Sequence, residues 1–162
     1  MTMDITKSVA FTGHRSERIL QVRMLYLYLD IVSQVKRLYS LGYRYFLSGM
    51  AEGFDLLAAQ AVADLKMEYT DIRLIAVVPF RRQPDRYRPE NKSLYDRIMK
   101  TADETVILRE DYRKGCFHHR NDYLIDNSEI VLAYWDKQPY GGTYYTVGKA
   151  RIMNRIIINL YK

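Results

Sequence analysis

The sequence has almost no cysteine and no long apolar run. Its single cysteine, Cys116, cannot form an intramolecular disulfide, so a disulfide-stapled secreted fold is excluded. No uncharged apolar stretch approaches the roughly 18 residues of a membrane-spanning helix, which argues against a membrane protein or a membrane partner. Residues 1–9 include Asp4 and Lys7 and lack the apolar core of a secretory signal. These absences predict a cytoplasmic protein.

The composition is that of an ordinary globular chain. It has 162 residues, of which 48% are hydrophobic and 27% charged, with 8 glycines and 4 prolines. Disordered, collagen-like and coiled-coil chains are thereby excluded, and the length predicts one domain over residues 1–162. The net charge is +6, and residues 81–100 hold seven basic and three acidic side chains. Such a charge is typical either of a nucleic-acid or phosphate partner or of a solvated surface.

Short β-branched runs alternate with longer helical patterns along the chain, as in βαβ units around a parallel sheet. Residues 73–78 are almost continuously apolar, which is typical of a strand buried on both faces. The sequence therefore predicts a Rossmann-like, doubly wound, mainly parallel α/β sheet of five to six strands with helices on both faces. The expected strands are residues 8–12, 45–48, 73–78, 105–108, 130–135 and 156–160, and the expected helices are residues 18–41, 52–69, 91–102, 117–127 and 143–153.

The longest expected helix, residues 18–41, has apolar side chains at steps of three and four, which indicates one buried face. Gly42 follows it, in the place where a helix commonly ends. The side chains expected on the buried face are Val22, Leu25, Leu29, Val32, Val35 and Leu38.

Glycine and polar residues follow most of the expected strands. In an open parallel sheet, ligands bind outside the carboxyl ends of the strands, near a switch point in strand order. Glycines let backbone amides approach a phosphate closely, and the unpaired N–H groups at a helix N-terminus attract anions. The candidate ligand-binding residues at these strand ends are Gly13, His14, Arg15, Ser48, Gly49, Met50, Gly53, Asp55, Pro79, Phe80, Gly141, Gly142 and Thr143.

Several of these residues also have a purely structural interpretation. Gly13, Gly49 and Gly142 could serve only to turn the chain. Asp55 lies in the first turn of an expected helix, where a carboxylate stabilises the helix dipole, and it could equally accept a hydrogen bond from a ribose hydroxyl. Arg15 could pair with a phosphate or a carboxylate through two parallel hydrogen bonds. Three glycine-bearing turns at one edge of a sheet favour anion binding.

Other chemistry finds little support. Neither G-x-G-x-x-G after the first strand nor G-x-x-x-x-G-K-[ST] occurs, which disfavours a dinucleotide dehydrogenase or a P-loop NTPase. Cys116, His118 and His119 stand together, but no second cluster of such residues is near, so neither a metal site nor a cofactor is predicted. These three residues also lie too close along one helix for a Cys/His nucleophile, and no Ser/His/Asp triad can be assembled.

The motifs at the strand ends are Thr12-Gly13-His14-Arg15, Ser48-Gly49-Met50-Ala51-Glu52-Gly53-Phe54-Asp55, Pro79-Phe80 and Gly142-Thr143, with residues 121–128 ahead of the fifth strand. In this order they resemble the YpsA-like family of the SLOG superfamily, named for the DNA-processing protein Smf/DprA and the Lonely Guy (LOG) cytokinin-activating enzymes. The resemblance covers about residues 9–158. It implies a Rossmann-like domain that binds a nucleotide or nucleotide-derived ligand at the carboxyl ends of its strands.

LOG enzymes, which are similar in fold, hydrolyse the N-glycosidic bond of nucleoside monophosphates with a P-G-G-x-G-T-x-x-E motif whose Glu is catalytic. Aligned on Gly142 and Thr143, this chain has Thr146 in place of that Glu. The resemblance therefore implies a phosphate cradle without the LOG catalytic group. We expect the phosphate at the N-terminus of the last helix, held by the backbone N–H groups of Gly142 and Thr143. The leading hypothesis is a sensor or regulatory module for a nucleotide or an ADP-ribose-like small molecule.

Two further functions stay open. Glu52 or Asp55 could supply a catalytic carboxylate from another loop, which would make the chain a LOG-like phosphoribohydrolase. The basic residues 81–100 favour single-stranded DNA binding of the DprA kind, although only Tyr87 and Tyr95 interleave aromatic rings with this charge. The sequence is also compatible with a homo-oligomer.

Overall fold

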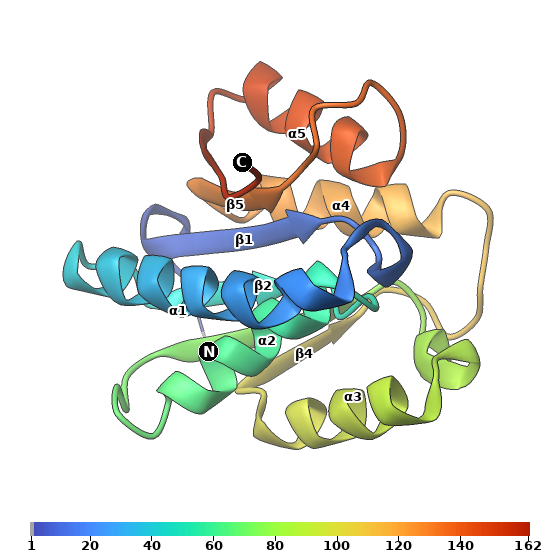
Figure 1. Cartoon of the computed structure of the whole chain (residues 1–162), viewed down its shortest axis with the longest axis horizontal. Helices are drawn as coiled ribbons and strands as arrows, with labels where there is room; N and C mark the ends of the chain where they lie inside the picture. The colour runs from blue at the N-terminus through green and yellow to red at the C-terminus, as the bar shows by residue number, and fades with distance from the viewer. Residues whose placement is uncertain (1) are drawn as a thin grey trace.

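The computed structural model describes residues 2–162, which form one six-stranded parallel sheet in the order β4-β3-β2-β1-β5-β6. From β1 the chain adds strands outward to β4 and then crosses back to place β5 and β6 on the other side of β1 (Figure 1). The predicted Rossmann-like, doubly wound α/β class is confirmed. The strands are β1 (Ser8–Gly13), β2 (Tyr45–Ser48), β3 (Arg73–Val78), β4 (Glu104–Ile107), β5 (Ile130–Tyr134) and β6 (Ile156–Asn159).

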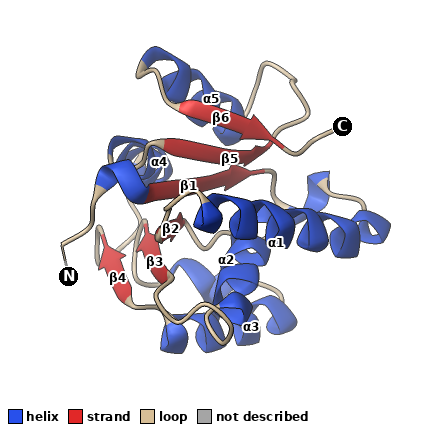
Figure 2. Ribbon diagram, turned by 90° about the vertical axis from the view of Figure 1, so that its left-hand side faces the viewer, coloured by secondary structure: helices blue, strands red, loops and turns tan. Residues whose placement is uncertain are grey.

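Helices cover both faces of the sheet (Figure 2). Helices α1, α2 and α3 lie on one face, against alternate strand residues such as Val9 and Phe11, and α4 and α5 lie on the other, against residues such as Ala10 and Val131. Successive strand side chains point to opposite faces, so strands buried on both sides are apolar throughout. The helices are α1 (Met24–Ser40), α2 (Phe54–Leu65), α3 (Pro89–Thr101), α4 (Cys116–Asp126) and α5 (Gly142–Ile152).

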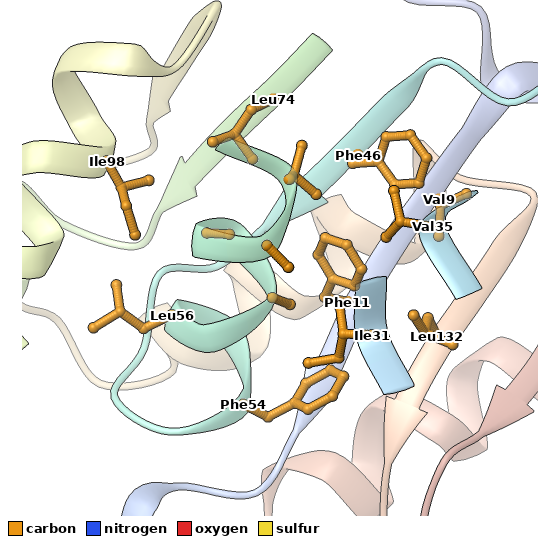
Figure 3. Packing of buried hydrophobic residues seen from close by; sticks show 14 of the residues in the cluster. Val9, Phe11, Ile31, Val35, Phe46, Phe54, Leu56, Leu74, Ile98 and Leu132 are labelled. Carbon is orange, nitrogen blue, oxygen red and sulfur yellow. The ribbon is translucent and has the colours of Figure 1, made fainter. Parts of the chain in front are cut away.

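Aromatic side chains fill the larger core layer, between the sheet and α1 and α2. Phe11 lies between Phe46 and Phe54, with ring centroids 6.2 and 6.3 Å away (Figure 3). All three rings are fully buried. Because Phe54 is the first residue of α2, this packing fixes the N-terminus of that helix against the end of β1.

The start of α1 departs from the sequence prediction. Two short 3-10 turns, Ser16–Arg18 and Gln21–Arg23, precede the helix, which begins at Met24 instead of residue 18. The expected buried stripe was wrong in its N-terminal half, because Val22, Leu25 and Leu29 are 75, 65 and 52% exposed. The helix buries another stripe with the same three- and four-residue steps, so periodicity alone could not choose between them. That stripe is Leu27, Ile31, Val35 and Leu38.

Smaller differences lie in the segment after β3. Residues 80–90, for which neither a helix nor a strand was expected, contain a 3-10 turn, η4 (Gln83–Arg86). Helix α3 begins two residues earlier than expected, at Pro89, since proline suits the first turn of a helix. Among residues 2–162, no helix combines the length and apolar character that crossing a bilayer requires.

Candidate functional site

A cavity of about 480 Å³ opens where the strand order reverses, at the carboxyl ends of β1 and β5. Gly13 at the end of β1 pairs in register with Tyr134 at the end of β5, and the chain leaves these two strands in different directions. The walls come from the loop after β1 and from the first residues of α2, α4 and α5. The predicted site residues that line this cavity are Gly13, His14, Arg15, Asp55, Gly141, Gly142 and Thr143.

The N-terminus of α5 forms one wall. Gly141 precedes the helix with φ of 95°, a conformation that glycine adopts readily, and no side chain caps the helix. The first bond of the helix runs from the Tyr145 N–H to the Gly141 carbonyl, so the preceding N–H groups have no partner within the helix. A Cβ atom at Gly142 would meet only the Asn121 Nδ2 atom, at 3.9 Å. The backbone amides at this helix end are therefore open to the cavity.

Three arginines border the cavity, and they differ in how far they are already engaged. Arg120 is buried and donates to the Gly49 carbonyl at 2.7 Å and to Asn121 Oδ1 at 2.8 Å. Arg18 donates to Asp136 at 2.6 Å. Arg15 makes no hydrogen bond or ion pair through its side chain within residues 2–162, and its guanidinium lies 5.4 Å from the centroid of the Phe117 ring. Arg15 is thus the one of these three arginines whose guanidinium donors are all free within residues 2–162.

Asp55 is the buried carboxylate of this cavity, which the exposed Glu17 also lines. It lies in the first turn of α2 and is only 6% exposed, and its Oδ1 atom has no hydrogen-bond partner within residues 2–162. Burial raises the pKa of Asp55, while the charges of Arg120 and Arg15 act in the opposite direction. A buried polar atom without a partner is rare in a folded protein and costs stability. The residue reaches the cavity wall, while its Oδ1 atom itself lies below the surface.

His14 faces the cavity but is engaged elsewhere. The side chain is buried, and its Nε2 atom accepts a hydrogen bond from the backbone N–H of Asp136 at 2.9 Å. Burial lowers the pKa of His14, and the nearby Arg18 charge lowers it further. The neutral ring thus holds the loop between β5 and α5 in place. His14 is therefore a positioning residue for that loop.

From the hydrogen bond between the Asp136 N–H and His14 Nε2 we predict a pH-dependent contribution to stability. We expect His14→Gln to lower the free energy of unfolding by about 1 kcal/mol at pH 7.5. Histidine in the unfolded chain takes up a proton near pH 6.5, whereas folded His14 does so only at lower pH. The contribution of His14 is therefore present above pH 6.5 and lost as the pH falls below it. Urea unfolding of both proteins at pH 7.5 and 5.5 measures this, and a difference that stays constant would contradict it.

The turn after β2 lies beneath the cavity instead of lining it. The Ser48 hydroxyl donates to the Asp55 carbonyl at 2.8 Å and accepts the Met50 N–H at 3.1 Å. Met50 is fully buried and has φ of 61°. Of the residues that were predicted to contact a ligand, Ser48, Gly49, Met50 and Gly53 do not line this cavity, and Asp55 alone from this motif reaches it.

Three of the predicted glycines are required for close packing. A Cβ atom at Gly13 would lie 2.4 Å from the Phe54 ring, and one at Gly49 would lie 2.6 Å from the Arg120 guanidinium. At Gly53, where φ is 102°, a Cβ would lie 2.6 Å from the His14 carbonyl oxygen and the Ser16 nitrogen. These glycines let elements approach one another, in contrast to Gly142.

A second cavity of about 840 Å³ adjoins the first and shares Arg15 and Phe117 with it. Phe80, which was predicted from the end of β3, lines this space, whereas Pro79 before it does not. Glu52 also lines it, and its Oε2 atom accepts hydrogen bonds from the Arg88 N–H and the Asn91 amide at the start of α3.

Sequence reasoning missed the contribution of α4. Phe117, His118, Arg120 and Asn121 all line the first cavity from the beginning of this helix. A helix that follows one parallel strand and precedes the next also begins at the carboxyl edge of the sheet, and this rule could have found them. Within residues 2–162, no group of three or more His, Cys, Asp or Glu side chains is arranged to hold a metal ion, at Cys116 or elsewhere.

Comparison with protein families gives one match over most of the chain. A model described as the YspA SLOG family matches residues 9–156. The UPF0398 protein YpsA of Bacillus subtilis (strain 168) is 31% identical over 100 residues, which are 60% of this chain and 56% of that protein. A UPF0398 protein of Bacillus cereus (strain B4264) is 29% identical over 101 residues. The chain thus spans about half the length of the curated relatives it matches.

Solved structures share the fold at low sequence identity. DNA processing protein A from Helicobacter pylori, whose structure was determined for its single-stranded DNA binding mode, superposes with a TM-score of 0.64 at 16% identity, over 95% of this chain and 66% of that one. The molybdenum cofactor carrier protein of Chlamydomonas reinhardtii superposes with a TM-score of 0.56 at 13% identity, over 95% of this chain and 75% of that one.

Proposed function

Because this chain belongs to the YspA SLOG family, we propose that it binds a nucleotide or a nucleotide-derived ligand in the cavity at the ends of β1 and β5, as a sensor or regulatory module. The phosphate lies at the N-terminus of α5, where the amides of Gly142 and Thr143 are open to the cavity. The free guanidinium of Arg15 lies on the same cavity and supplies a further charge-assisted contact.

The observation that carries the proposal is the unpartnered Asp55 beside these donors. Amides and Arg15 select an anion, yet a bare phosphate offers no hydrogen-bond donor to the Asp55 carboxyl group, which lines the same cavity. A nucleotide solves both requirements, since its phosphate accepts hydrogen bonds and its ribose hydroxyls donate them. The ribose therefore lies over Asp55. The two structural neighbours support a ligand-binding role in general, because one binds single-stranded DNA and the other is a carrier of the molybdenum cofactor.

Replacing Asp55 by asparagine tests this assignment. Asp55→Asn keeps the shape of the side chain and removes its charge, so we expect binding of AMP to weaken about tenfold or more, the size of one hydrogen bond to a charged group. Binding of 2′,3′-dideoxy-AMP, which lacks the hydroxyls, should change little. Isothermal titration calorimetry measures both ligands, and Asp64→Asn, at the other end of α2, is the matched control.

Two outcomes would contradict different parts of the proposal. If no nucleoside monophosphate binds the unaltered protein, the proposed function is wrong. If Asp55→Asn binds AMP as tightly as the unaltered protein does, the ligand is placed wrongly over Asp55, while nucleotide binding itself stands.

Hydrolysis of a nucleoside monophosphate is the second candidate function. Thr146, at the position of the LOG catalytic Glu, is fully buried, and its hydroxyl donates to the Gly142 carbonyl at 2.9 Å. Glu52 is engaged at the start of α3. Asp55 is then the carboxylate best placed to act. Chromatography detects any base that is released when the protein is incubated with nucleoside monophosphates. Turnover that disappears in Asp55→Asn would favour the enzyme over the binding module.

Single-stranded DNA binding has weaker support from the surface charges. Arg81 donates two hydrogen bonds to Glu110, at 2.8 and 3.0 Å, and Arg82 pairs with Asp85 at 2.8 Å. These two arginines of the basic segment are therefore partly neutralised. An oligonucleotide that binds with a steep dependence on salt would restore this candidate, because phosphate contacts release counterions.

A further inference from the structure

The larger cavity, of about 840 Å³, lies on the far side of Arg15 from the α5 N-terminus and has no role in the function proposed above. Residues after β3, in the η4 turn, and in the connection from β4 to α4 form its walls. Arg15 and Phe117 belong to both cavities, so the two spaces meet at these side chains. A ligand with its phosphate at α5 can therefore extend past Arg15 into the larger space, which has the size of a small-molecule site.

Three aromatic rings gather on one wall of this cavity. The centroid of Phe80 lies 5.7 Å from that of Tyr112 and 6.1 Å from that of Phe117, and the Tyr112 and Phe117 centroids are 6.2 Å apart. Tyr112 is nevertheless 60% exposed, and its hydroxyl makes no hydrogen bond within residues 2–162. Such a ring has a free face on which a planar group can stack.

The same cavity has charged groups without partners. Arg86 and Asp111 line it, and within the described residues 2–162 neither forms an ion pair, whereas their neighbour Arg82 is paired with Asp85. An aliphatic ligand would cover these charges without satisfying them. A planar heteroaromatic ring can stack on Tyr112 and still offer hydrogen-bonding atoms at its edge to Arg86 and Asp111.

We propose that the larger cavity is the base compartment of the site, in which the nucleobase of the ligand stacks on Tyr112. The inference rests on the proposed function, because the phosphate and ribose occupy the smaller cavity. It adds that the base is recognised on the opposite side of Arg15, by residues from the η4 turn and the β4–α4 connection. The ligand is then a complete nucleotide, and a sugar phosphate leaves the larger cavity empty.

Comparing AMP with ribose 5-phosphate, which lacks the base, tests the inference by calorimetry. We expect the unaltered protein to bind AMP more tightly. Tyr112→Ala should weaken AMP binding by about 5- to 100-fold, the range for loss of one base–aromatic stack, and should leave ribose 5-phosphate binding unchanged. Tyr112→Phe keeps the ring and should bind AMP as the unaltered protein does.

Tyr26→Ala is the matched control, since Tyr26 is 67% exposed on α1 and lines neither cavity. Equal affinities of the unaltered protein for AMP and ribose 5-phosphate would overturn the base compartment and leave the proposed function standing. A Tyr112→Ala variant that weakens both ligands equally, or neither, would overturn it as well. Absence of binding by both ligands would overturn the proposed function and this inference together.

Discussion

Gly53→Ala is expected to lower the free energy of unfolding by about 3 kcal/mol or more, and the variant should lose much of its folded population. Two costs combine at this position. The φ of 102° belongs to a region that residues with a Cβ avoid. The Cβ would also lie 2.6 Å from backbone atoms of His14 and Ser16, which cannot rotate away as a side chain can. Urea unfolding followed by circular dichroism measures the loss.

Gly42→Ala separates the two costs. Gly42 also has φ of 102°, but a Cβ there would meet nothing within 4 Å. The free energy of unfolding of this control should therefore fall only by the cost of its backbone conformation, about 1–2 kcal/mol. If the two variants lose the same stability, the close approach of α2 to the loop after β1 is not what requires Gly53.

Gly142→Val is expected to weaken nucleotide binding at least 100-fold without unfolding the protein. A Cβ at this position meets only Asn121 Nδ2, at 3.9 Å, so the valine side chain enters the cavity and not the core. It would displace the phosphate from the amides of Gly142 and Thr143, and two hydrogen bonds to a charged group contribute about 3 kcal/mol or more. Calorimetry with AMP measures the affinity, and thermal unfolding checks the fold.

Gly148→Val is the control for this prediction. Gly148 belongs to the same helix, and a Cβ there also meets nothing within 4 Å, but the residue does not line the cavity. The variant should bind AMP as the unaltered protein does. Equal binding by Gly142→Val and Gly148→Val would show that the phosphate does not lie at the N-terminus of α5.

Most of the fold could be predicted because its strands carry a strong local signal. Arg73–Val78 is nearly all apolar, and Ile130–Tyr134 is bounded by polar turns, so their existence and boundaries were predicted to within a residue or so. The buried face of α1 could not be predicted equally well. Its sequence holds two apolar stripes with helical spacing, and the choice between Leu27 and Leu25 depends on how the helix meets the sheet.

The site residues also differ in how well the sequence could predict them. Position after a strand predicted that Arg15, Asp55 and Gly142 lie at one edge of the sheet, and all three line the cavity there. Glycine content was less informative, because it could not separate Gly142, which faces open space, from Gly53, which lies against backbone. Arg120 was missed because only the residues directly after each strand were considered, although the start of α4 lies at the same edge.

A crystal structure of the complex with AMP tests the central claim most directly, because it locates the phosphate. We predict phosphate oxygens within hydrogen-bonding distance of the Gly142 and Thr143 amide nitrogens and the Arg15 guanidinium, with a ribose hydroxyl at the Asp55 carboxyl group. A phosphate bound anywhere else on the protein, with these amides left free, would contradict it.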